Sequence, residues 1–239
     1  MPKYEIDMSR GSIFKNLIRF AIPLLLTNLL QILYNTADTI VAGRCEGSDA
    51  LAAIGATSYL HNLTVNLFLG LSIGAGVVVA KKFGAGNMQG LRKTVHTTVS
   101  LGGIMGVACM VVGLIFCKPL LAVMGTPEAI IDTSALYMRI VFLGIPGAMV
   151  YNFGAAVLRS VGDSKRPLYI LATTGLLNVA LNLVFIVWLR MGVVGVALAT
   201  VVANYVSATL VIFVLKKSDT AYRLNFRELA LDKNDTVEI

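Results

Sequence analysis

An aspartate lies inside the first long apolar segment of the chain, within a run of polar side chains at helical spacing. The run consists of Asn28, Gln31, Asn35 and Asp38. Steps of three and four residues place these side chains on one face of an α-helix, and Tyr34 flanks them. A carboxylate in the membrane interior is costly when charged, so it takes up a proton or a small cation. The spacing therefore predicts an ion-coupling site at Asp38, although proximity to Arg44 leaves open that Asp38 simply reaches water.

Polar residues recur at similar spacing in later apolar segments. They are Ser58, Asn62 and Asn66, then Asn152, then Thr174, Asn178 and Asn182, and finally Thr200, Asn204 and Ser207. Unpaired polar groups in hydrocarbon cost several kcal/mol each. Hydrogen bonds between helices would explain two or three such residues, whereas stripes on four segments are explained better by a hydrated cavity inside a bundle.

These stripes predict two groups of site residues. Hard cations prefer oxygen ligands, so we expect neutral oxygens near Asp38 to complete a proton or Na⁺ site. The predicted cation-coupling residues are Asp38, Asn178, Asn182 and Thr200. The predicted lining of a substrate cavity is Asn28, Gln31, Tyr34, Asn35, Asn62, Asn66, Asn152 and Asn204.

Other reactive residue types form no recognisable catalytic pattern. His61 and His96 have no carboxylate or cysteine partner at ligand spacing, so we interpret His61 as a cavity residue and His96 as interfacial. The cysteines are odd in number and contain no CxxC pair, which argues against a disulfide framework or a metal site. Nucleotide-binding loops and nucleophile elbows are also absent from the sequence. We expect neither an enzyme nor a bound cofactor.

The composition indicates that lipid is the solvent of the elements carrying these residues. The chain has 239 residues, of which 56% are hydrophobic and 14% charged, and its mean hydropathy is +0.78. Soluble domains carry about 25% charged residues. Although the net charge is +7, the charges fall between apolar runs and not on one face, which argues against nucleic acid as a partner.

Six segments are long enough to cross a bilayer of about 30 Å as helices. They cover about 17–42, 51–80, 95–116, 135–158, 168–189 and 193–215. Apolar and polar residues do not alternate along these segments as they do in the strands of a membrane β-barrel. The predicted fold is therefore an all-α, six-helix transmembrane lobe over residues 1–216. Pro23 lies inside the first helix, where it should produce a static kink or a functional hinge.

The basic residues predict the orientation of these helices. All but four of the 20 Lys and Arg residues fall on the side that holds the N-terminus, which makes that side cytoplasmic. The even number of spans then returns the C-terminus to the cytoplasm. The tail over 217–239 is charged, and the residues around Leu224, Phe226 and Leu229 fit either a short amphipathic helix or a plain linker.

Several motifs resemble one transporter family. They are Ile22-Pro23 with residues 35–43, the glycine-containing stretch 70–74, the loop 83–87 and the loop 158–167. Together they are similar to the multidrug and toxic compound extrusion (MATE) family, in particular its DinF-like bacterial branch. The resemblance implies an antiporter in the bacterial inner membrane that exports cationic or amphiphilic compounds in exchange for H⁺ or Na⁺.

The resemblance also implies roles for individual residues. The family's first-helix Asp corresponds to Asp38, its bending Pro to Pro23, and its aromatic residue one turn before the Asp to Tyr34. The polar pair on the fifth helix and the Thr on the sixth correspond to Asn178, Asn182 and Thr200. Some members carry a second Asp where this chain has Asn182, which removes a charge that would favour tight Na⁺ binding.

The chain differs from the family in length. MATE proteins resemble two six-helix lobes in one chain, and this sequence resembles the N-terminal lobe alone. It would then be a truncated product, the partner of a separate C-terminal lobe, or one half of a parallel homodimer. The competing functions are a flippase for lipid-linked precursors from the same superfamily, which would need a more cationic cavity, and an inert fragment.

Overall fold

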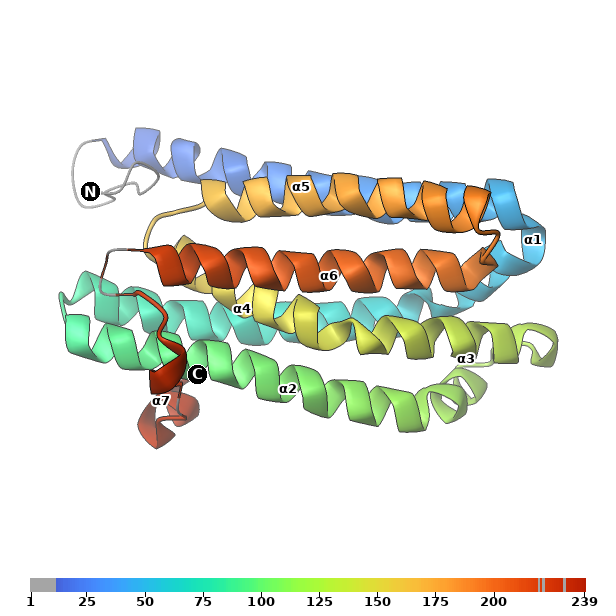
Figure 1. Cartoon of the computed structure of the whole chain (residues 1–239). Coiled ribbons are helices and arrows are strands. Elements are labelled where there is room, and N and C mark those ends of the chain that lie inside the picture. Colours follow the sequence, from blue (N-terminus) through green and yellow to red (C-terminus); the bar gives the residue numbers. More distant parts are fainter. Residues whose placement is uncertain (1–11, 219, 221, 230) are drawn as a thin grey trace.

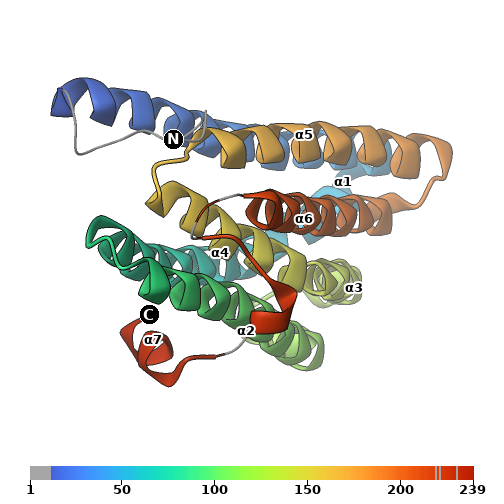
Figure 2. The ribbon, with the colours of Figure 1, turned by 60° about the vertical axis from the view of Figure 1, so that its left-hand side comes forward.

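The computed structural model describes residues 12–218, 220, 222–229 and 231–239; within these, side chains are described except at residues 13, 35, 42, 44–50, 227, 233, 234 and 237. Described residues form helices and contain no strand, so the prediction of an all-α fold is confirmed. The helices lie roughly side by side along one long axis (Figures 1 and 2).

The first helical element, α1 (Ile13–Gly84), doubles back on itself. Figure 1 shows it crossing the molecule, turning at the far end and returning. Its two arms contain the first apolar spans, Phe14–Val41 and Leu51–Gly84. Pro23 is buried in the first arm, and the Thr27 hydroxyl donates to the Pro23 carbonyl at 2.7 Å.

The next span is α2 (Met88–Val123), which begins after a tight turn. The Asn87 side chain caps this helix by accepting a hydrogen bond from the Gly90 backbone N–H at 2.9 Å. Such a cap satisfies one of the free N–H groups at a helix start. The cap and the turn hold the start of α2 beside the end of α1.

A bend of 45° separates α3 (Glu128–Leu143) from α4 (Ile145–Ser160), where the sequence predicts one span over 135–158. The cause is Pro146, which has no N–H to donate to the preceding turn and disfavours helical geometry at the residue before it. The Leu143 carbonyl at the break accepts a hydrogen bond from the Tyr205 hydroxyl at 2.9 Å. This bond, from the helix α6 (Gly192–Lys217), satisfies a carbonyl at the break.

The last two spans are α5 (Lys165–Asn182), which continues into the π-helix η1 (Leu183–Trp188), and α6 (Gly192–Lys217). α6 packs tightly against the start of α4: a Cβ on Gly147 would lie 3.0 Å from the backbone of Asn204 and Tyr205. Only glycine allows two helix backbones this close. In the described residues, five helical segments are long and apolar enough to span a membrane, and the bent α3–α4 pair makes a sixth.

The core is built around α4, which contacts α1, α2 and α6. Its side chains Phe153, Val157 and Leu158 are fully buried. Large apolar side chains elsewhere, such as Leu25 and Ile115, are more than 60% exposed on the outside of the bundle. An apolar outer surface around a packed interior is the arrangement expected of a protein in lipid.

The tail after α6 folds back onto α1 and α2, where its short helices η2 (Phe226–Glu228) and α7 (Lys233–Glu238) lie (Figure 1). Tyr222 and Leu224 are buried in the core between the main helices. This stretch contains a single 3₁₀ turn, Phe226–Glu228, and its apolar side chains divide between the core, where Leu224 is buried, and the surface, where Phe226 and Leu229 are exposed.

Hydrogen bonds and ion pairs fix the course of the tail. The His96 ring accepts from the Asn225 backbone N–H through Nε2 at 2.9 Å, and its Nδ1 lies 2.7 Å from the Arg92 carbonyl. Glu228 pairs with Arg92 at 2.5 and 2.8 Å. Lys81 pairs with Glu238 at 2.7 Å, and Lys82 pairs with Asp235. Acidic groups of the tail therefore partly neutralise the basic end of the α1–α2 hairpin.

Candidate functional site

Asp38 lies at the centre of a polar cluster formed by α1, α5 and α6. Asn182 donates a hydrogen bond from Nδ2 to Oδ1 of Asp38. The Thr200 hydroxyl lies 3.5 Å from Oδ2 of Asp38 and 3.1 Å from the Val196 carbonyl, so its single proton has two acceptors. The carboxylate therefore has donors from two helices that are distant from it in the sequence.

Asn178 extends the cluster by one turn of α5. Its Oδ1 accepts from Asn182 Nδ2 at 3.3 Å, and its Nδ2 donates to the Thr200 hydroxyl at 3.4 Å. Asn178 is 5% exposed and Asn182 is fully buried. The four predicted cation-coupling residues are thus brought together, although their role in coupling stays a prediction.

One oxygen in this cluster has no hydrogen-bond partner among the described residues. Oδ1 of Asn182 is buried, lies on the same amide that donates to Asp38, and accepts nothing. A buried unpaired acceptor costs free energy. An amide rotation would turn this oxygen toward Asp38, where it would serve as a neutral ligand for a hard cation.

The local structure of α5 explains why Asn182 lies where it does. Asn178 and Asn182 are one helical turn apart, so they share a face. Asn182 is the last residue of α5 before the backbone widens into η1, where the Leu189 N–H donates to the Val184 carbonyl. Short π-helical segments often occur at functional sites, and this one directly follows the cluster.

A cavity of about 190 Å³ opens beside the cluster. Five residues of the predicted substrate cavity line it: Gln31, Tyr34, Asn62, Asn152 and Asn204. Three of the predicted cation-coupling residues also line it: Asp38, Asn178 and Thr200. Asp38 supplies the charge, and no Lys or Arg lines the cavity in the described part of the chain. The cavity is large enough for several water molecules, and amide groups and one acidic group form much of its polar surface.

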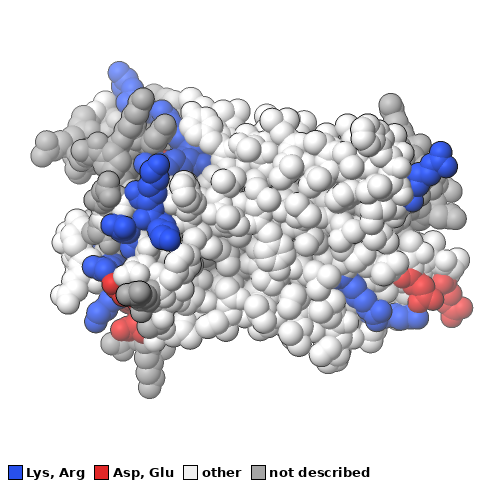
Figure 3. Space-filling model, in the orientation of Figure 1, with Lys and Arg blue, Asp and Glu red and all other residues white. Residues whose placement is uncertain are grey.

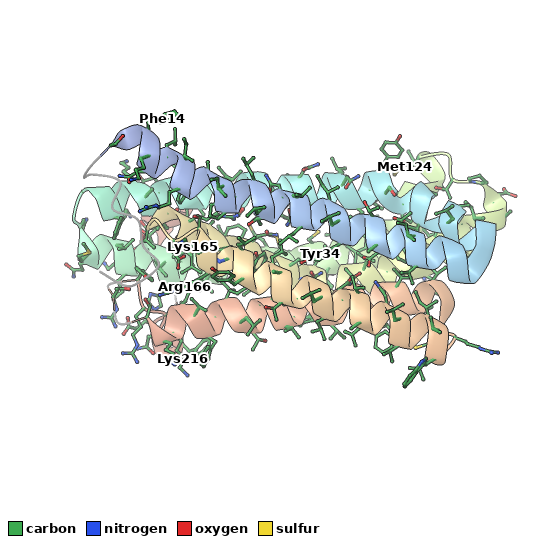
Figure 4. The ribbon with its side chains drawn as sticks, turned by 90° about the horizontal axis from the view of Figure 1, so that it is seen from above. Phe14, Tyr34, Met124, Lys165, Arg166 and Lys216 are labelled. Atoms are coloured by element: carbon green, nitrogen blue, oxygen red, sulfur yellow. The ribbon has the colours of Figure 1, made fainter. Side chains whose placement is uncertain are left out.

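Tyr34 spans the space between α1 and α5. Its hydroxyl donates to the Ala172 carbonyl at 3.2 Å. Figure 4 places Tyr34 near the middle of the long axis, with Phe14, Lys165, Arg166 and Lys216 at one end and Met124 at the other. The cavity therefore lies at mid-depth in the bundle, far from both charged ends.

Two predicted lining residues lie elsewhere. Asn28 and Asn66 are exposed on the outside of the lobe and do not line the cavity. Asn35 is helical, but its side chain lies outside the described set. Asn28 is ten residues from Asp38, or about 15 Å along the helix axis. Polar residues on one face of a helix can therefore extend beyond the ends of a small cavity.

The cavity is also lined by residues outside the two predicted groups of site residues. Tyr151 of α4 is buried there, and its hydroxyl donates to the Pro167 carbonyl at 3.1 Å. His61, interpreted from the sequence as a cavity residue, also lines the cavity, and its Nδ1 has no hydrogen-bond partner among the described residues. Thr174 and Ser207 complete the polar lining and bond each other at 2.8 Å. Helical spacing is the signal for the last two, whereas Tyr151 resembles an ordinary core residue in sequence.

Comparison with known proteins finds the same fold and related sequences. Residues 23–184 match the family model MatE. The chain is 33% identical over 220 residues to the probable multidrug resistance protein YoeA of Bacillus subtilis, and 28% identical over 224 residues to the probable multidrug resistance protein NorM of Thermotoga maritima. These matches cover 90% and 92% of this chain but 48% and 47% of the relatives.

Solved structures agree. The chain superposes on the crystal structure of MATE in the bent conformation with a TM-score of 0.87 at 28% identity, covering 95% of this chain and 50% of that one. It also matches a MOP superfamily transporter from Pyrococcus furiosus with a TM-score of 0.86 at 27% identity, covering 96% and 51%. The chain spans about half the length of the curated relatives and structures that it matches.

Proposed function

The chain belongs to the MatE family of multi-pass membrane proteins, and we propose that it forms one lobe of a cation-coupled antiporter for cationic or amphiphilic compounds. The observation that carries the proposal is the contact between Asp38 and the cavity. One carboxylate there can hold either a coupling cation or a positively charged substrate. Because the two compete for the same negative charge, binding one releases the other.

The hydrogen bonds around Asp38 support this exchange. In the arrangement described, Asn182 and Thr200 donate to the carboxylate, which is satisfied without a bound cation. A proton on Asp38 would turn the carboxyl into a donor, toward an oxygen such as Oδ1 of Asn182. A sodium ion would instead require Asn182 to present that oxygen, with the Thr200 hydroxyl as a further ligand.

The charge of the cavity favours a cationic substrate. Its described lining includes one acidic residue and no Lys or Arg, while Tyr34 and Tyr151 contribute aromatic surface. Aromatic faces and a single negative charge suit amphiphilic cations. The alternative, a flippase for lipid-linked anionic precursors, would need Lys or Arg in the cavity. A reverse polarity of the binding pocket, suggesting a different function, is described for the matched transporter from Pyrococcus furiosus.

The exposed polar residues on α1 support a need for a second lobe. Asn28 and Asn66 are exposed within apolar spans, where contact with acyl chains would cost free energy. A C-terminal lobe from another chain, or a second copy of this one, would cover them and enlarge the cavity. Crosslinking in membranes distinguishes a homodimer from a lobe that works with a different partner.

The distribution of charge supports a bacterial cytoplasmic membrane with both termini inside. Lys and Arg gather at the ends of the bundle in Figure 3, and the broad middle of this face carries no charge. The end that holds Lys81, Lys82 and Lys216 has more basic residues than the end with Lys118 and Arg190. The positive-inside rule then makes the former end cytoplasmic.

A binding competition in detergent tests the coupling role without requiring a second lobe. The purified chain should bind ethidium, and added protons or Na⁺ should weaken that binding. The Asp38→Asn variant should lose this competition, whereas Asp132→Asn, an exposed carboxylate paired with Lys118, should retain it. Equal competition in the wild type and in Asp38→Asn would overturn the coupling role.

Transport in vesicles tests the remainder of the proposal. Vesicles that contain the chain should accumulate or release ethidium when a proton or sodium gradient is imposed, and the effective gradient identifies the coupling ion. Transport by the chain alone, with crosslinked dimers, would support a homodimer. Ethidium binding without transport would support one lobe that requires a different partner, whereas no binding would favour an inert fragment.

A further inference from the structure

A second hollow, of about 890 Å³, lies at the basic end of the bundle, away from the central cavity. Its walls come from the start of α2, the end of α6 and the tail. They consist of Met88, Gln89, Arg92, Lys216, Thr220, Arg223, Leu224, Asn225 and Phe226. The proposed transport cycle assigns it no role.

Three cationic side chains converge on this hollow from three different elements. Arg92 comes from α2, Lys216 from the last turn of α6, and Arg223 from the tail. In the part of the chain that the structure describes, no Asp or Glu lines the hollow. Glu228 pairs with Arg92 from a neighbouring hollow, so Lys216 and Arg223 supply the net positive charge among the described lining residues.

The shape of the group that would fit follows from the donors. Arg presents a planar set of N–H groups that matches phosphate oxygens, and Lys adds a compact charge. Gln89 and Thr220 add neutral hydrogen-bonding groups to the wall. These donors suit a phosphate ester with a polar substituent.

The hollow lies where lipid headgroups meet a membrane protein. Lys216 and Lys217 end the last apolar span, and Figure 4 shows Lys216 at the same end as Lys165 and Arg166. Phe213, one turn earlier, is 59% exposed, and Lys217 Nζ lies 5.8 Å from its ring centre. Phe226 is 51% exposed, with Lys216 Nζ 5.6 Å from its ring centre. Exposed apolar surface therefore adjoins the cationic hollow.

We propose that the hollow lined by Arg92, Lys216 and Arg223 binds the phosphate headgroup of an anionic phospholipid. The acyl chains would run along the apolar outer surface near Phe213. Basic pockets of this kind between membrane helices bind anionic lipid headgroups. The proposal rests on the membrane spans and not on the transport function, and a bound lipid would join α2, α6 and the tail.

Native mass spectrometry of the purified chain, with phosphatidylglycerol and phosphatidylcholine of matched acyl chains, tests the proposal. The wild type should retain one phosphatidylglycerol in clear preference to phosphatidylcholine. The double variant Lys216→Gln/Arg223→Gln should bind phosphatidylglycerol about 25-fold more weakly, since each cation contributes about fivefold. Its phosphatidylcholine binding should stay unchanged.

A matched control removes two charges from the opposite end, in Lys118→Gln/Arg190→Gln, and should leave lipid binding as in the wild type. Equal loss in the control, or equal binding of both lipids by the wild type, would overturn the proposal. Displacement of the lipid by excess inorganic phosphate would also overturn it, since the site would then take the free anion.

The charge-retaining variant Lys216→Arg/Arg223→Lys is a control that separates loss of charge from misfolding. It should bind phosphatidylglycerol nearly as well as the wild type. If both double variants aggregate in detergent, the wild-type preference between the two headgroups and its resistance to inorganic phosphate still decide the outcome.

Discussion

Asn182 on α5 donates its amide hydrogen to Asp38 on α1, which lies 144 residues earlier in the sequence. The fully buried amide contributes one hydrogen-bonded atom and one free oxygen to the same site. Removal of either side chain leaves the other without this hydrogen bond in a buried place, so the pair links the stability of the lobe to the polar cluster around Asp38.

Replacement of Asn182 by Ala should reduce the free energy of unfolding by about 1–3 kcal/mol, because the Asp38 carboxylate then loses a buried donor. Asp38→Asn should cost less, since its side-chain carbonyl still accepts from Asn182. Thermal unfolding in detergent measures both. The double variant Asp38→Ala/Asn182→Ala should lose less stability than the sum of the losses in the single variants Asp38→Ala and Asn182→Ala. Strict additivity of the three values would show that the two side chains do not interact energetically.

Water should reach the central cavity from at least one side of the membrane. In a background that lacks the three native cysteines, Asn152→Cys and Asn204→Cys should react with a water-soluble thiol reagent, because both positions line the cavity. Val112→Cys on the apolar outer surface of α2, where the side chain is 53% exposed, should react slowly in lipid vesicles. The reverse order of reactivity would contradict a hydrated cavity.

The contact between α2 and α4 depends on a glycine. A Cβ on Gly106 would lie 2.7 Å from Cα of Pro146, which is backbone and cannot rotate away. Gly106→Ala should therefore lower stability by about 1–3 kcal/mol, as overpacking does.

Gly103→Ala is the matched control, because a Cβ there would meet nothing within 4 Å. It should be neutral or stabilise the helix by about 0.5–1 kcal/mol. Thermal unfolding of both variants under the same conditions gives the comparison, and similar losses would argue against close packing at Gly106.

Acid should release the tail from the α1–α2 hairpin. The hydrogen bonds from Arg92 lower the pKa of Glu228, and the hydrogen bond from Lys81 lowers the pKa of Glu238, relative to the ordinary value of 4.5. A carboxylate with a lowered pKa stabilises the docked state at pH values above its ordinary pKa. This stabilisation of the docked tail is lost as the pH falls from about the ordinary pKa through the lowered pKa of each carboxyl group.

Hydrogen exchange of the backbone around 222–238 measures the release. Exchange should be slow at pH 7 and, after correction for the intrinsic rate, faster below pH 4. The double variant Glu228→Gln/Glu238→Gln should show partial release at pH 7 and little further change in acid. Protection that is independent of pH in the wild type would show that the ion pairs do not hold the tail.

The sequence predicts the helical class well because apolar length and polar spacing are local properties. Asp38, Asn178, Asn182 and Thr200 each lie on a stripe that the helical period defines, and the structure brings them together. The spacing of polar residues shows which face of a helix they occupy. It does not show which helix packs against that face, or how far a cavity extends along it. Asn28 and Asn66 therefore share predicted stripes and still lie outside.

Features that depend on distant contacts could not be predicted. The π-helix after Asn182 arises in an apolar stretch, 183–188, with no residue that marks it. The bend at Gly144 could have been inferred from Pro146, but its angle depends on packing with α6. The pairing of tail acids such as Glu228 with Arg92 joins residues 136 positions apart, which no local pattern encodes.

The hydrogen bond from Tyr205 to the Leu143 carbonyl has a mechanical consequence. Thr200, which contacts Asp38, and Tyr205 both belong to α6 and lie a little more than one helical turn apart. Gly147 of α4 packs against the α6 backbone at Asn204 and Tyr205. The bend between α3 and α4 is thus hydrogen-bonded to the same helix that places Thr200 beside Asp38. A shift of α6 along its axis by a fraction of a turn would move the bend as well, so a displacement at the Asp38 cluster would be transmitted to the connection between α3 and α4.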